Sequence, residues 1–253
     1  MRRVLVTGAS RGIGRAVARA FAERGDRVAV HYATRREDAE RTLRELPGEG
    51  HVLVGGDLAD AEVARGVVEE AVRALGGVDV LVNNAALAPG ADNRHAVADV
   101  SYTDWQEIWQ RMIQVNLLGS VNVTYGVARH LIERGEPGSI VNIGSRGAFR
   151  GEPDFPAYGA GKAALHAFGQ SMAVALAPHG IAVASVAPGF VATERQAGKL
   201  AGPEGGALRD QSPFGRVGTP EEVAAAVLYL ASPEATWASG TVLDVNGASH
   251  LRT

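Results

Sequence analysis

A tyrosine and a lysine are separated by one helical turn at the start of the apolar segment "AYGAGKAALHAFGQSMAVALA", residues 157–177. Residues i and i+4 of a helix share a face, so Tyr158 and Lys162 are expected to interact. A free tyrosine, with a pKa of about 10, is a slow acid–base group at neutral pH. A nearby ammonium lowers that pKa by roughly 1–3 units. The pair is suited to general acid–base catalysis, although such a pair taken alone is more often a contact on a helix surface.

A second group of residues, at the N-terminus, is suited to binding phosphate. In "VLVTGASRGIGRAVARAF", Gly8, Gly12 and Gly14 lie between an apolar run and an amphipathic helical pattern. Such glycines permit a tight turn, a close approach of backbone to a pyrophosphate, and close packing of helix on strand. The helix N-terminus then offers free N–H groups to the phosphates. The turn predicts dinucleotide binding; the alternative is a turn used only for packing.

The end of the second apolar run indicates which dinucleotide is bound. NAD sites place an acid there for the ribose 2′-hydroxyl, but residues 31–34 are "HYAT" and two arginines, Arg35 and Arg36, follow. With Arg11 in the glycine turn, these cations suit a 2′-phosphate and favour NADP(H); the alternative is a solvated helix start. Asp57, in "GGDLAD", either reaches the adenine edge or caps the next helix.

Two glycines, Gly159 and Gly161, lie between the tyrosine and the lysine. Each costs a helix about 1 kcal/mol relative to alanine, so they predict a close approach of other atoms. Two explanations fit: a nicotinamide and its ribose lying against this turn, or tight packing against a helix of a partner subunit.

The elements that would position these residues are an alternation of strands and helices. Seven short β-prone runs, "RRVLVT", "DRVAVHY", "HVLVGG", "VDVLVN", "GSIVNIG", "GIAVASVAP" and "GTVLDVN", lack a polar face, as expected of strands covered on both sides. Helical patterns separate them, at about 13–24, 36–46, 60–75, 104–134, 157–178 and 220–231. The sequence predicts a single α/β domain over residues 1–253, with a doubly wound, parallel, seven-stranded, Rossmann-like sheet. Long segments at about 86–103 and 189–219 leave strands at the ligand-binding edge and are expected to be substrate loops.

Composition excludes several other functions. The 253 residues carry a net charge of −3 and no cysteine, so disulfides and thiolate sites are excluded. We expect no nucleic-acid partner, because no basic patch is concentrated in the chain, and no catalytic metal, because no histidine pair has ligand spacing. No apolar run reaches the roughly 18 residues of a membrane span. These features predict a cytoplasmic protein without membrane contact.

With "TGASRGIG", "NNAA", Ser145 followed by "YGAGK", and "PGFVAT" in this order, the chain resembles the short-chain dehydrogenase/reductase family, and most of all its 3-oxoacyl-[acyl-carrier-protein] reductases. The likeness covers nearly the whole length. It implies hydride transfer between NADP(H) and a carbonyl or secondary alcohol. It also implies a homodimer or homotetramer in which the helix at 157–178 takes part.

The resemblance assigns roles to four catalytic residues. Ser145 would hold the carbonyl oxygen, Tyr158 would protonate it and Lys162 would tune Tyr158. Asn116 would hold a water that links Lys162 to solvent. The predicted cofactor-binding residues are Gly8, Ser10, Arg11, Gly12, Ile13, Gly14, Tyr32, Arg35, Asp57, Leu58, Asn84, Ala85, Tyr158, Lys162, Pro188, Gly189, Val191 and Thr193.

The chain also departs from the family pattern. Ala86 replaces a glycine after "NNA", Asn246 and Ala248 stand where aspartate and glycine are common, and the segment at 86–103 is longer than usual. The default substrate is a 3-oxoacyl thioester, on acyl carrier protein or coenzyme A; a sugar, polyketide or xenobiotic carbonyl stays open. The alternatives are an NAD-dependent alcohol or sugar dehydrogenase and a non-catalytic dinucleotide sensor, which would not need the four catalytic residues.

Overall fold

Strands form where valine, isoleucine and alanine are concentrated. The computed structural model describes residues 1–252, and within them all seven predicted strands are present. Their β-branched residues favour extended backbone and pack well between two layers. The strands are β1 (Arg3–Val6), β2 (Arg27–Tyr32), β3 (Val52–Gly55), β4 (Val80–Asn83), β5 (Gly138–Ile143), β6 (Ile181–Pro188) and β7 (Val242–Val245).

The strands pair in the order β3-β2-β1-β4-β5-β6-β7, and every pairing is parallel. The order reverses between β1 and β4, because β2 and β3 lie on one side of β1 and the later strands on the other. A reversal of this kind opens a crevice beyond the carboxyl ends of the strands. The predicted doubly wound, Rossmann-like fold is therefore confirmed.

The predicted helices are present with small differences at their ends, and one of them is divided. The stretch expected at 104–134 consists of two α-helices joined by a π-helical turn. The main helices are α1 (Gly12–Glu23), α2 (Arg36–Glu45), α3 (Ala61–Leu75), α4 (Tyr102–Ile113), η2 (the π-turn, Gln114–Leu118), α5 (Gly119–Arg134), α7 (Pro156–Leu176) and α10 (Pro220–Leu230).

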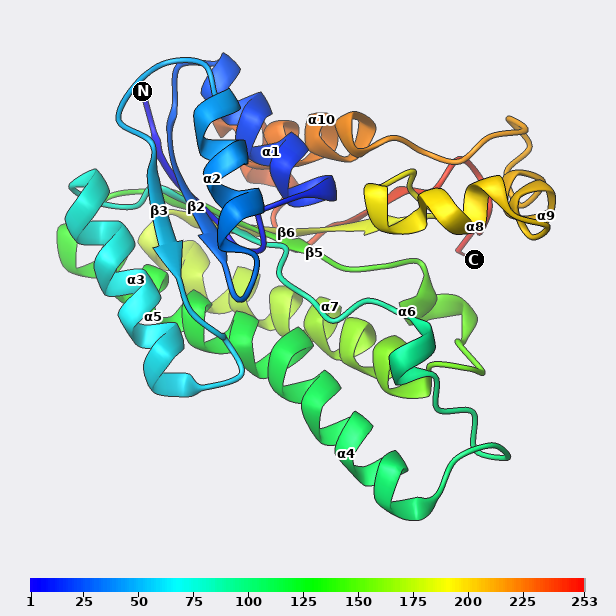
Figure 1. The fold of residues 1–253 in the computed structure, drawn as a ribbon. Helices are drawn as coiled ribbons and strands as arrows, with labels where there is room; N and C mark the ends of the chain where they lie inside the picture. Colours follow the sequence, from blue (N-terminus) through cyan, green and yellow to red (C-terminus); the bar gives the residue numbers. More distant parts are fainter. Residues whose placement is uncertain (253) are drawn as a thin grey trace.

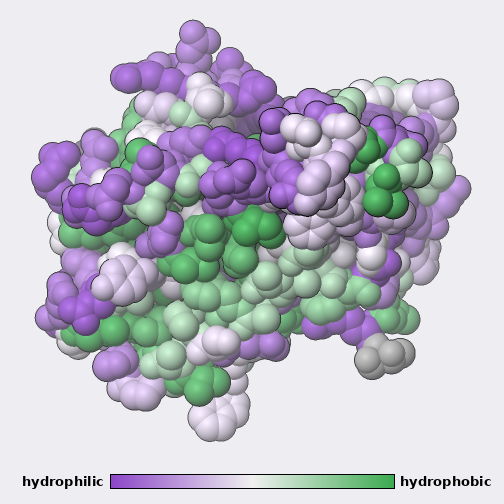
Figure 2. Space-filling view, turned by 90° about the horizontal axis from the view of Figure 1, so that it is seen from below, coloured by the Kyte–Doolittle hydropathy of each residue, from purple (hydrophilic) through white to green (hydrophobic). Residues whose placement is uncertain are grey.

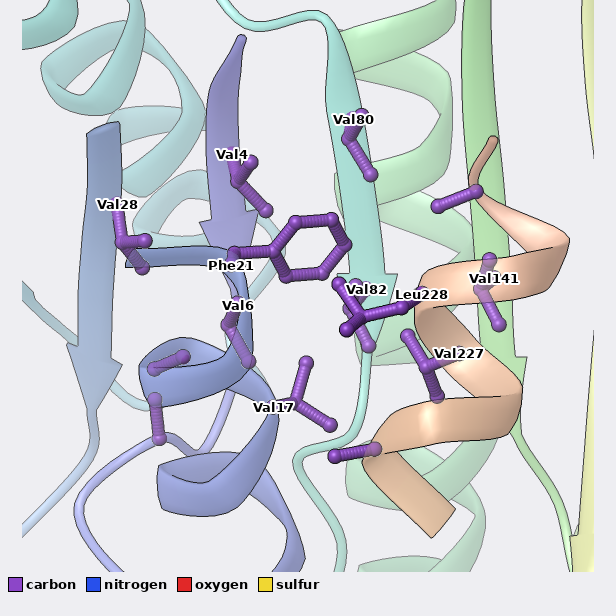
Figure 3. Close-up of a cluster of buried hydrophobic side chains, with 14 of the residues drawn as sticks. Val4, Val6, Val17, Phe21, Val28, Val80, Val82, Val141, Val227 and Leu228 are labelled. Carbon is purple, nitrogen blue, oxygen red and sulfur yellow. The ribbon is translucent and has the colours of Figure 1, made fainter. Parts of the chain in front are cut away.

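Helices cover both faces of the sheet. Figure 1 shows α1, α2 and α10 on one face and α3, α5 and α7 on the other. On the first face, Phe21 of α1 and Val227 of α10 pack over valines of β1 and β4 (Figure 3). On the second face, residues of α3, α5 and α7 cover Leu5 and Leu81. Complete burial of each such side chain contributes roughly 1.5–3 kcal/mol to stability.

The two predicted substrate loops contain short helices that the sequence did not predict. The first holds a 3-10 turn, η1 (Ala91–Asn93), and ends where α4 begins. The second holds η4 (Glu194–Gln196), α8 (Ala197–Ala201) and α9 (Gly205–Arg209). Further short elements are α6 (Gly147–Arg150), η3 (Ala177–His179) and η5 (Pro233–Ala238). None of the helices within the described residues is long and apolar enough to span a membrane.

Candidate active site

A cleft of about 680 Å³ lies at the carboxyl edge of the sheet, a size typical of small-ligand sites. It brings together all of the predicted cofactor-binding residues and three of the four predicted catalytic residues. The cleft is lined by Gly8, Ser10, Arg11, Gly12, Ile13, Gly14, Tyr32, Arg35, Asp57, Leu58, Asn84, Ala85, Ser145, Tyr158, Lys162, Pro188, Gly189, Val191 and Thr193. Asn116 is fully buried behind this wall.

The glycine turn between β1 and α1 can be built only with glycine at two positions. Gly8 has a left-handed backbone, with φ of +64°, and a Cβ there would lie 2.8 Å from the Cα of Ala85. A Cβ on Gly14 would lie 2.3 Å from the carbonyl oxygen of Gly8. Asn84 fixes the turn, because its amide Nδ2 donates to the carbonyls of Thr7 and Gly8 at 2.8 and 3.0 Å. The turn is a cradle of bare backbone, as close approach to a pyrophosphate requires.

A buried histidine, His31 at the end of β2, also holds this turn. Its Nδ1 accepts a hydrogen bond from the backbone N–H of Gly8 at 3.0 Å, and its Nε2 lies 2.9 Å from the carbonyl of Gly56. The ring must therefore be neutral, with the proton on Nε2. Burial lowers the pKa of His31 to about 4, which keeps it in this form near neutral pH. This role was not predictable from the sequence, since nothing in the local pattern links positions 31 and 8.

The N-terminus of α1 faces a carboxylate from the second substrate loop. Glu194 accepts hydrogen bonds from the backbone N–H of Gly12 and from Nη1 of Arg15, both at 3.1 Å. Arg11 is the N-cap residue of α1, and its side chain forms no capping hydrogen bond. The first N–H groups of a helix are a ready anion site. Glu194 thus binds where a dinucleotide phosphate would be expected.

The cations predicted near the 2′-phosphate divide into two groups. Arg11 and Arg35 line the cleft, whereas Arg36 pairs with Glu40 along the exposed side of α2. Burial, followed by the charges of Arg35 and Arg195, lowers the pKa of Arg11, which reflects a concentrated positive field. An anion bound here would relieve this repulsion.

Asp57 lines the cleft but does not cap the following helix. Asp60 takes that position, accepting hydrogen bonds from the N–H groups of Glu62 and Val63. Asp57 instead accepts a hydrogen bond from Arg111 of α4 at 2.6 Å. The capping alternative for Asp57 is therefore wrong.

Tyr158 and Lys162 lie in the first two turns of α7, on the face directed at the cleft. The Lys162 ammonium is 5.9 Å from the centre of the Tyr158 ring, and Nζ donates to the carbonyl of Ile143 at 2.7 Å. Lys162 is almost completely buried and forms no ion pair in the described part of the chain. Burial lowers its pKa to about 8 from 10.5, so the amine can gain and lose a proton near neutral pH.

The pKa of Tyr158 moves opposite to the sequence-based expectation. Burial raises the pKa of the phenol, and the hydrogen bond with Ser145 offsets this only in part. The expected lowering is therefore wrong in direction, because the loss of hydration around the phenolate is the largest effect on this pKa. Near neutral pH, Tyr158 is therefore a protonated phenol, a proton donor.

Ser145 lies two residues beyond β5 and is held by its neighbours. Its backbone N–H donates to Nε2 of His166 at 3.4 Å, and its Oγ accepts a hydrogen bond from the N–H of Gly147 at 3.0 Å. His166 is one turn after Lys162 on α7, and its ring packs edge-on against Phe149 at 5.1 Å. Burial lowers the pKa of His166 to about 4, so the ring stays neutral and can accept.

Asn116 lies in the π-helical turn rather than in a regular helix. Its Oδ1 accepts from the N–H of Leu87 at 2.7 Å, and its Nδ2 donates to the carbonyl of Leu87 at 3.0 Å. The side chain therefore ties the first substrate loop to the turn. π-Turns leave the regular helix pattern locally and are frequent at functional sites.

The glycines of α7 pack within the chain. A Cβ on Gly161 would touch Ile113 at 3.6 Å and Asn116 at 3.8 Å, and one on Gly159 would be 3.4 Å from the carbonyl of Gly147. These are ordinary contact distances, so alanine would fit at both positions. The glycines bring α7 close to the π-turn and to α6. The structure therefore adds an explanation that was not among the two proposed from sequence.

His95 of the first substrate loop caps the catalytic helix. Its Nε2 accepts a hydrogen bond from the N–H of Ala157 at 3.0 Å, and its Nδ1 lies 2.8 Å from the carbonyl of Asn93. The ring is fully buried and packs edge-on against Trp105 and Phe155. The N-terminus of α7, next to Tyr158, is thus satisfied from a distant segment, which sequence spacing could not indicate.

The departure at Ala248 has a structural cost. Ala248 has φ of +57°, and no other non-glycine residue in the described range has a positive φ. This left-handed conformation costs an alanine roughly 1–2 kcal/mol. A glycine at this position would adopt the same conformation without this cost.

Comparisons with known proteins show the family to which this chain belongs. A family model described as "Enoyl-(Acyl carrier protein) reductase" matches residues 8–250. The chain belongs to the short-chain dehydrogenase/reductase family. The resemblance inferred from its motifs is thereby confirmed, and the protein is an oxidoreductase.

The relatives differ in their substrates. The chain is 37% identical to an L-rhamnose 1-dehydrogenase (NAD(P)(+)) of Sphingomonas sp. over 98% of this chain and 96% of the relative. It is 36% identical to the 3-oxoacyl-[acyl-carrier-protein] reductase FabG of Vibrio cholerae, with the same coverage. A crystal structure of a short-chain dehydrogenase from Burkholderia cenocepacia in complex with NADP has a TM-score of 0.86 and 31% identity, covering 98% of this chain and 97% of that chain.

Proposed function

We propose that this oxidoreductase transfers a hydride between NADP(H) and a carbonyl or secondary alcohol. The observation that carries the proposal is the arrangement of Ser145, Tyr158 and Lys162 around one end of a cleft whose other end is a bare glycine turn. When bound, the nicotinamide cofactor would supply the hydride. The remaining requirements are a donor for the carbonyl oxygen and a source of protons, and side chains of this chain meet both.

NADP(H) rather than NAD(H) is supported by the charges at the adenine end. Arg11 and Arg35 line the cleft there, and no acid occupies residues 31–34 at the end of β2. The glycine turn with its left-handed Gly8 and Gly12 fits a pyrophosphate. The NADP complex of the Burkholderia relative also favours this choice.

The catalytic roles follow from protonation states and contacts. Ser145 Oγ would donate to the carbonyl oxygen and orient it, a contribution of roughly 3–4 kcal/mol for one preorganised donor. Tyr158, a protonated phenol near neutral pH, would give its proton to that oxygen. Lys162, with a pKa of about 8, would stabilise the phenolate that remains and return a proton to it. Asn116 would position the π-turn and the water that reaches Lys162.

The substrate is proposed as a 3-oxoacyl thioester, on acyl carrier protein or coenzyme A, or a related ketone. The Vibrio relative, similar over its whole length, supports this choice. The second candidate is oxidation of a sugar, which is favoured by a comparable likeness to the L-rhamnose dehydrogenase. Reduction of a thioester with NADPH would favour the first candidate, and oxidation of an L-sugar with NADP⁺ would favour the second.

We also infer a homodimer or homotetramer. Figure 2 shows a broad apolar band on the face that α3, α5 and α7 cover. Large apolar side chains are exposed on the π-turn, α5 and α7, among them Leu118, Tyr125 and Val174, the last 79% exposed. Light scattering of the purified protein would test this inference, and a monomer would contradict it. The cytoplasmic location stays a prediction.

Tyr158→Phe tests the proposed function. The variant should lose turnover by roughly 10²–10⁴-fold, the contribution of a general acid, while NADPH still binds. Binding is measured by fluorescence titration and turnover by NADPH absorbance. A variant that keeps wild-type turnover would contradict the mechanism. A wild-type preference for NADH of more than tenfold would contradict the cofactor choice.

A further inference from the structure

Arg146 is a buried cation next to the proposed catalytic serine. It follows Ser145 directly, lines the cleft and is only 7% exposed. Its guanidinium donates to the hydroxyl of Ser249 and to the side-chain carbonyl of Gln211. Both acceptors are neutral, and a guanidinium has five N–H donors in a planar fork. The fork therefore has donors beyond those that the two contacts use.

No carboxylate compensates this charge. Among residues 1–252, no acid lies within 4 Å of the Arg146 guanidinium. Glu152 is the acid whose charge acts on Arg146, and Arg150 acts on it in the opposite sense. A buried charge without a counter-ion is costly, which is why such groups in proteins are normally paired. The cost is difficult to explain by structure alone, since a neutral side chain could hold Ser249 and Gln211 equally well.

The lining of the cleft carries further unpaired positive charge. Arg150, Arg195 and Lys199 line the cleft, and none of them forms an ion pair with a described residue. Three acids line the cleft. Asp57 is paired with Arg111, and Glu194 is bound to Arg15 and the N-terminus of α1, which leaves Glu152. The other cations of the lining are accounted for, because Arg11 and Arg35 face the proposed 2′-phosphate, Arg111 pairs with Asp57, and Lys162 serves Tyr158. The lining of the cleft as a whole thus carries more cationic than anionic side chains.

We propose that the substrate is a carbonyl compound that carries a carboxylate, and that Arg146 binds this carboxylate while Ser145 and Tyr158 hold the carbonyl oxygen. The proposal rests on the hydride transfer proposed above, and among the related ketones named there it selects oxo acids with a free carboxylate in place of thioesters. A planar carboxylate matches the guanidinium fork and forms charge-assisted hydrogen bonds with it. Because Ser145 and Arg146 line the same cleft and are neighbours in the chain, we expect a short-chain oxo acid, in which a few methylene groups separate the acid group from the carbonyl.

The competing explanation is that Arg146 serves only to anchor the segment around Ser249. The two explanations differ in what the charge does for catalysis. An anchor affects all substrates equally, whereas a carboxylate receptor discriminates between an acid and its neutral ester. The decisive quantity is therefore the ratio of kcat/KM for the acid to kcat/KM for the ester.

The experiment compares 4-oxopentanoate, 5-oxohexanoate and 6-oxoheptanoate with their methyl esters, with NADPH and the intact protein. At least two methylene groups separate the ketone from the acid group in each pair, so the intrinsic reactivity of the ketone is nearly unchanged by esterification. Wild-type protein should prefer at least one acid by tenfold or more, the effect expected of a hydrogen bond to a charged group. Arg146→Gln should reduce this ratio to about one while the ester's kcat/KM changes less than threefold.

Two further variants complete the design. Arg146→Lys keeps the charge but loses the fork, so an intermediate ratio is expected; it also serves if Arg146→Gln does not fold. Arg216→Gln is the matched control, because Arg216 is exposed, pairs with Glu222 and lies outside the cleft lining. It should keep the wild-type ratio. Equal rates with acids and esters in wild type, or an equal loss for both in Arg146→Gln, would overturn the proposal.

A binding measurement separates this proposal from the proposed function. If no ketone of the panel is reduced, the melting temperature is measured with NADP⁺ and either pentanoate or pentanamide. A rise with pentanoate alone, absent in Arg146→Gln, supports the carboxylate site even though these ketones are not substrates. The absence of any rise with pentanoate in wild type overturns it, whatever reaction the protein catalyses.

Discussion

The two edges of the sheet handle buried charge in opposite ways. At the amino edge, Asp26 and Asp79 each precede a strand and each pairs with an arginine at the start of β1. At the carboxyl edge, Lys162 donates to a backbone carbonyl, and Arg146 donates to a hydroxyl and an amide; neither has an acid partner in the described chain. Asp26 is 5% exposed and Lys162 is 3% exposed, so burial alone does not decide which charges have a partner.

The comparison indicates which charges lower the stability of the fold and are expected to serve binding or catalysis. Ion pairs at the amino edge satisfy the charges within the chain, as a structural role requires. Charges without partners at the carboxyl edge raise the free energy of the folded state, and ligands that bring negative charge lower it again. Residues that destabilise the fold are therefore expected to be those that serve binding and catalysis.

The largest expected effect is on activity when the carboxyl-edge lysine is replaced. Lys162→Met should lower kcat by roughly 10²–10⁴-fold, because Tyr158 loses the group that stabilises its phenolate. Steady-state kinetics with NADPH and the best available ketone measure the loss. Arg19→Met, on an exposed ion pair of α1, is the control and should keep wild-type kcat. If kcat of Lys162→Met fell by less than tenfold, catalysis would not explain why this lysine is buried without an acid partner.

The same substitution should change how stability depends on pH. The pKa of Lys162 is about 8 in the fold against 10.5 in the unfolded chain. The folded form therefore binds the proton less well, and the penalty, about 3 kcal/mol, is fully present below pH 8. It is relieved as the pH rises from 8 to 10.5. Lys162→Met should be more stable than wild type at pH 7, by an amount that shrinks over this range in urea titrations. A constant difference would contradict the assignment.

At the amino edge the opposite result is expected. Asp79 accepts hydrogen bonds from the N–H and Nε of Arg3, both at 2.8 Å. Burial raises the pKa of Asp79, but these bonds outweigh it and lower the pKa below its usual value. Asp79→Asn should therefore destabilise the protein, by about 2 kcal/mol, with activity retained per folded molecule. This loss should shrink as the pH falls through the pKa of Asp79. A stabilised Asp79→Asn variant would erase the contrast between the edges.

A smaller effect is expected for Glu194, the acid that accepts a hydrogen bond from the N-terminus of α1. Glu194 competes with phosphate for the N–H of Gly12, so Glu194→Gln should bind NADPH about three- to tenfold more tightly. Isothermal titration measures the dissociation constant. Glu204→Gln, in the same loop but outside the cleft lining, is the control. Weaker binding by Glu194→Gln would mean that the carboxylate supports the site rather than competing for it.

The smallest effect concerns backbone strain at the carboxyl edge. Ala248 has a left-handed backbone in the segment that contacts Arg146, so Ala248→Gly should raise stability by up to about 1 kcal/mol. The change is measured by urea unfolding. Ala175→Gly, at an exposed position inside α7, should instead lose about 1 kcal/mol. A loss at both positions would show that Ala248 is not strained.

The sequence predicted the elements because each is marked locally. Valine-rich runs predicted the strands, and glycine turns and amphipathic periodicity predicted the helices. The interruption at Gln114–Leu118 was missed, because "QVNLL" contains neither glycine nor proline and fits an α-helix as well as a π-turn. The short helices α8 and α9 were missed because their five residues are too few to show a period.

The candidate site was predictable where chemistry and spacing coincide, as in Tyr158 and Lys162. Contacts between distant segments were not, so the roles of His31, His95 and Arg146 were missed. All three depend on partners more than 20 residues away, at Gly8, Ala157 and Ser249. The predicted shift of the Tyr158 pKa was wrong in direction, because the sequence spacing shows the nearby ammonium but not the loss of hydration around the phenol.

The π-turn between α4 and α5 has one more consequence. A π-turn can be regarded as an α-helix with one additional residue. Removing one residue, Leu117 for example, would let the two helices fuse into one regular rod, and the widened turn that contains Asn116 would be lost. Asn116 would then lose its two bonds to Leu87, and the first substrate loop would come loose. We therefore expect the shortened chain to have a more regular helix and a lower activity.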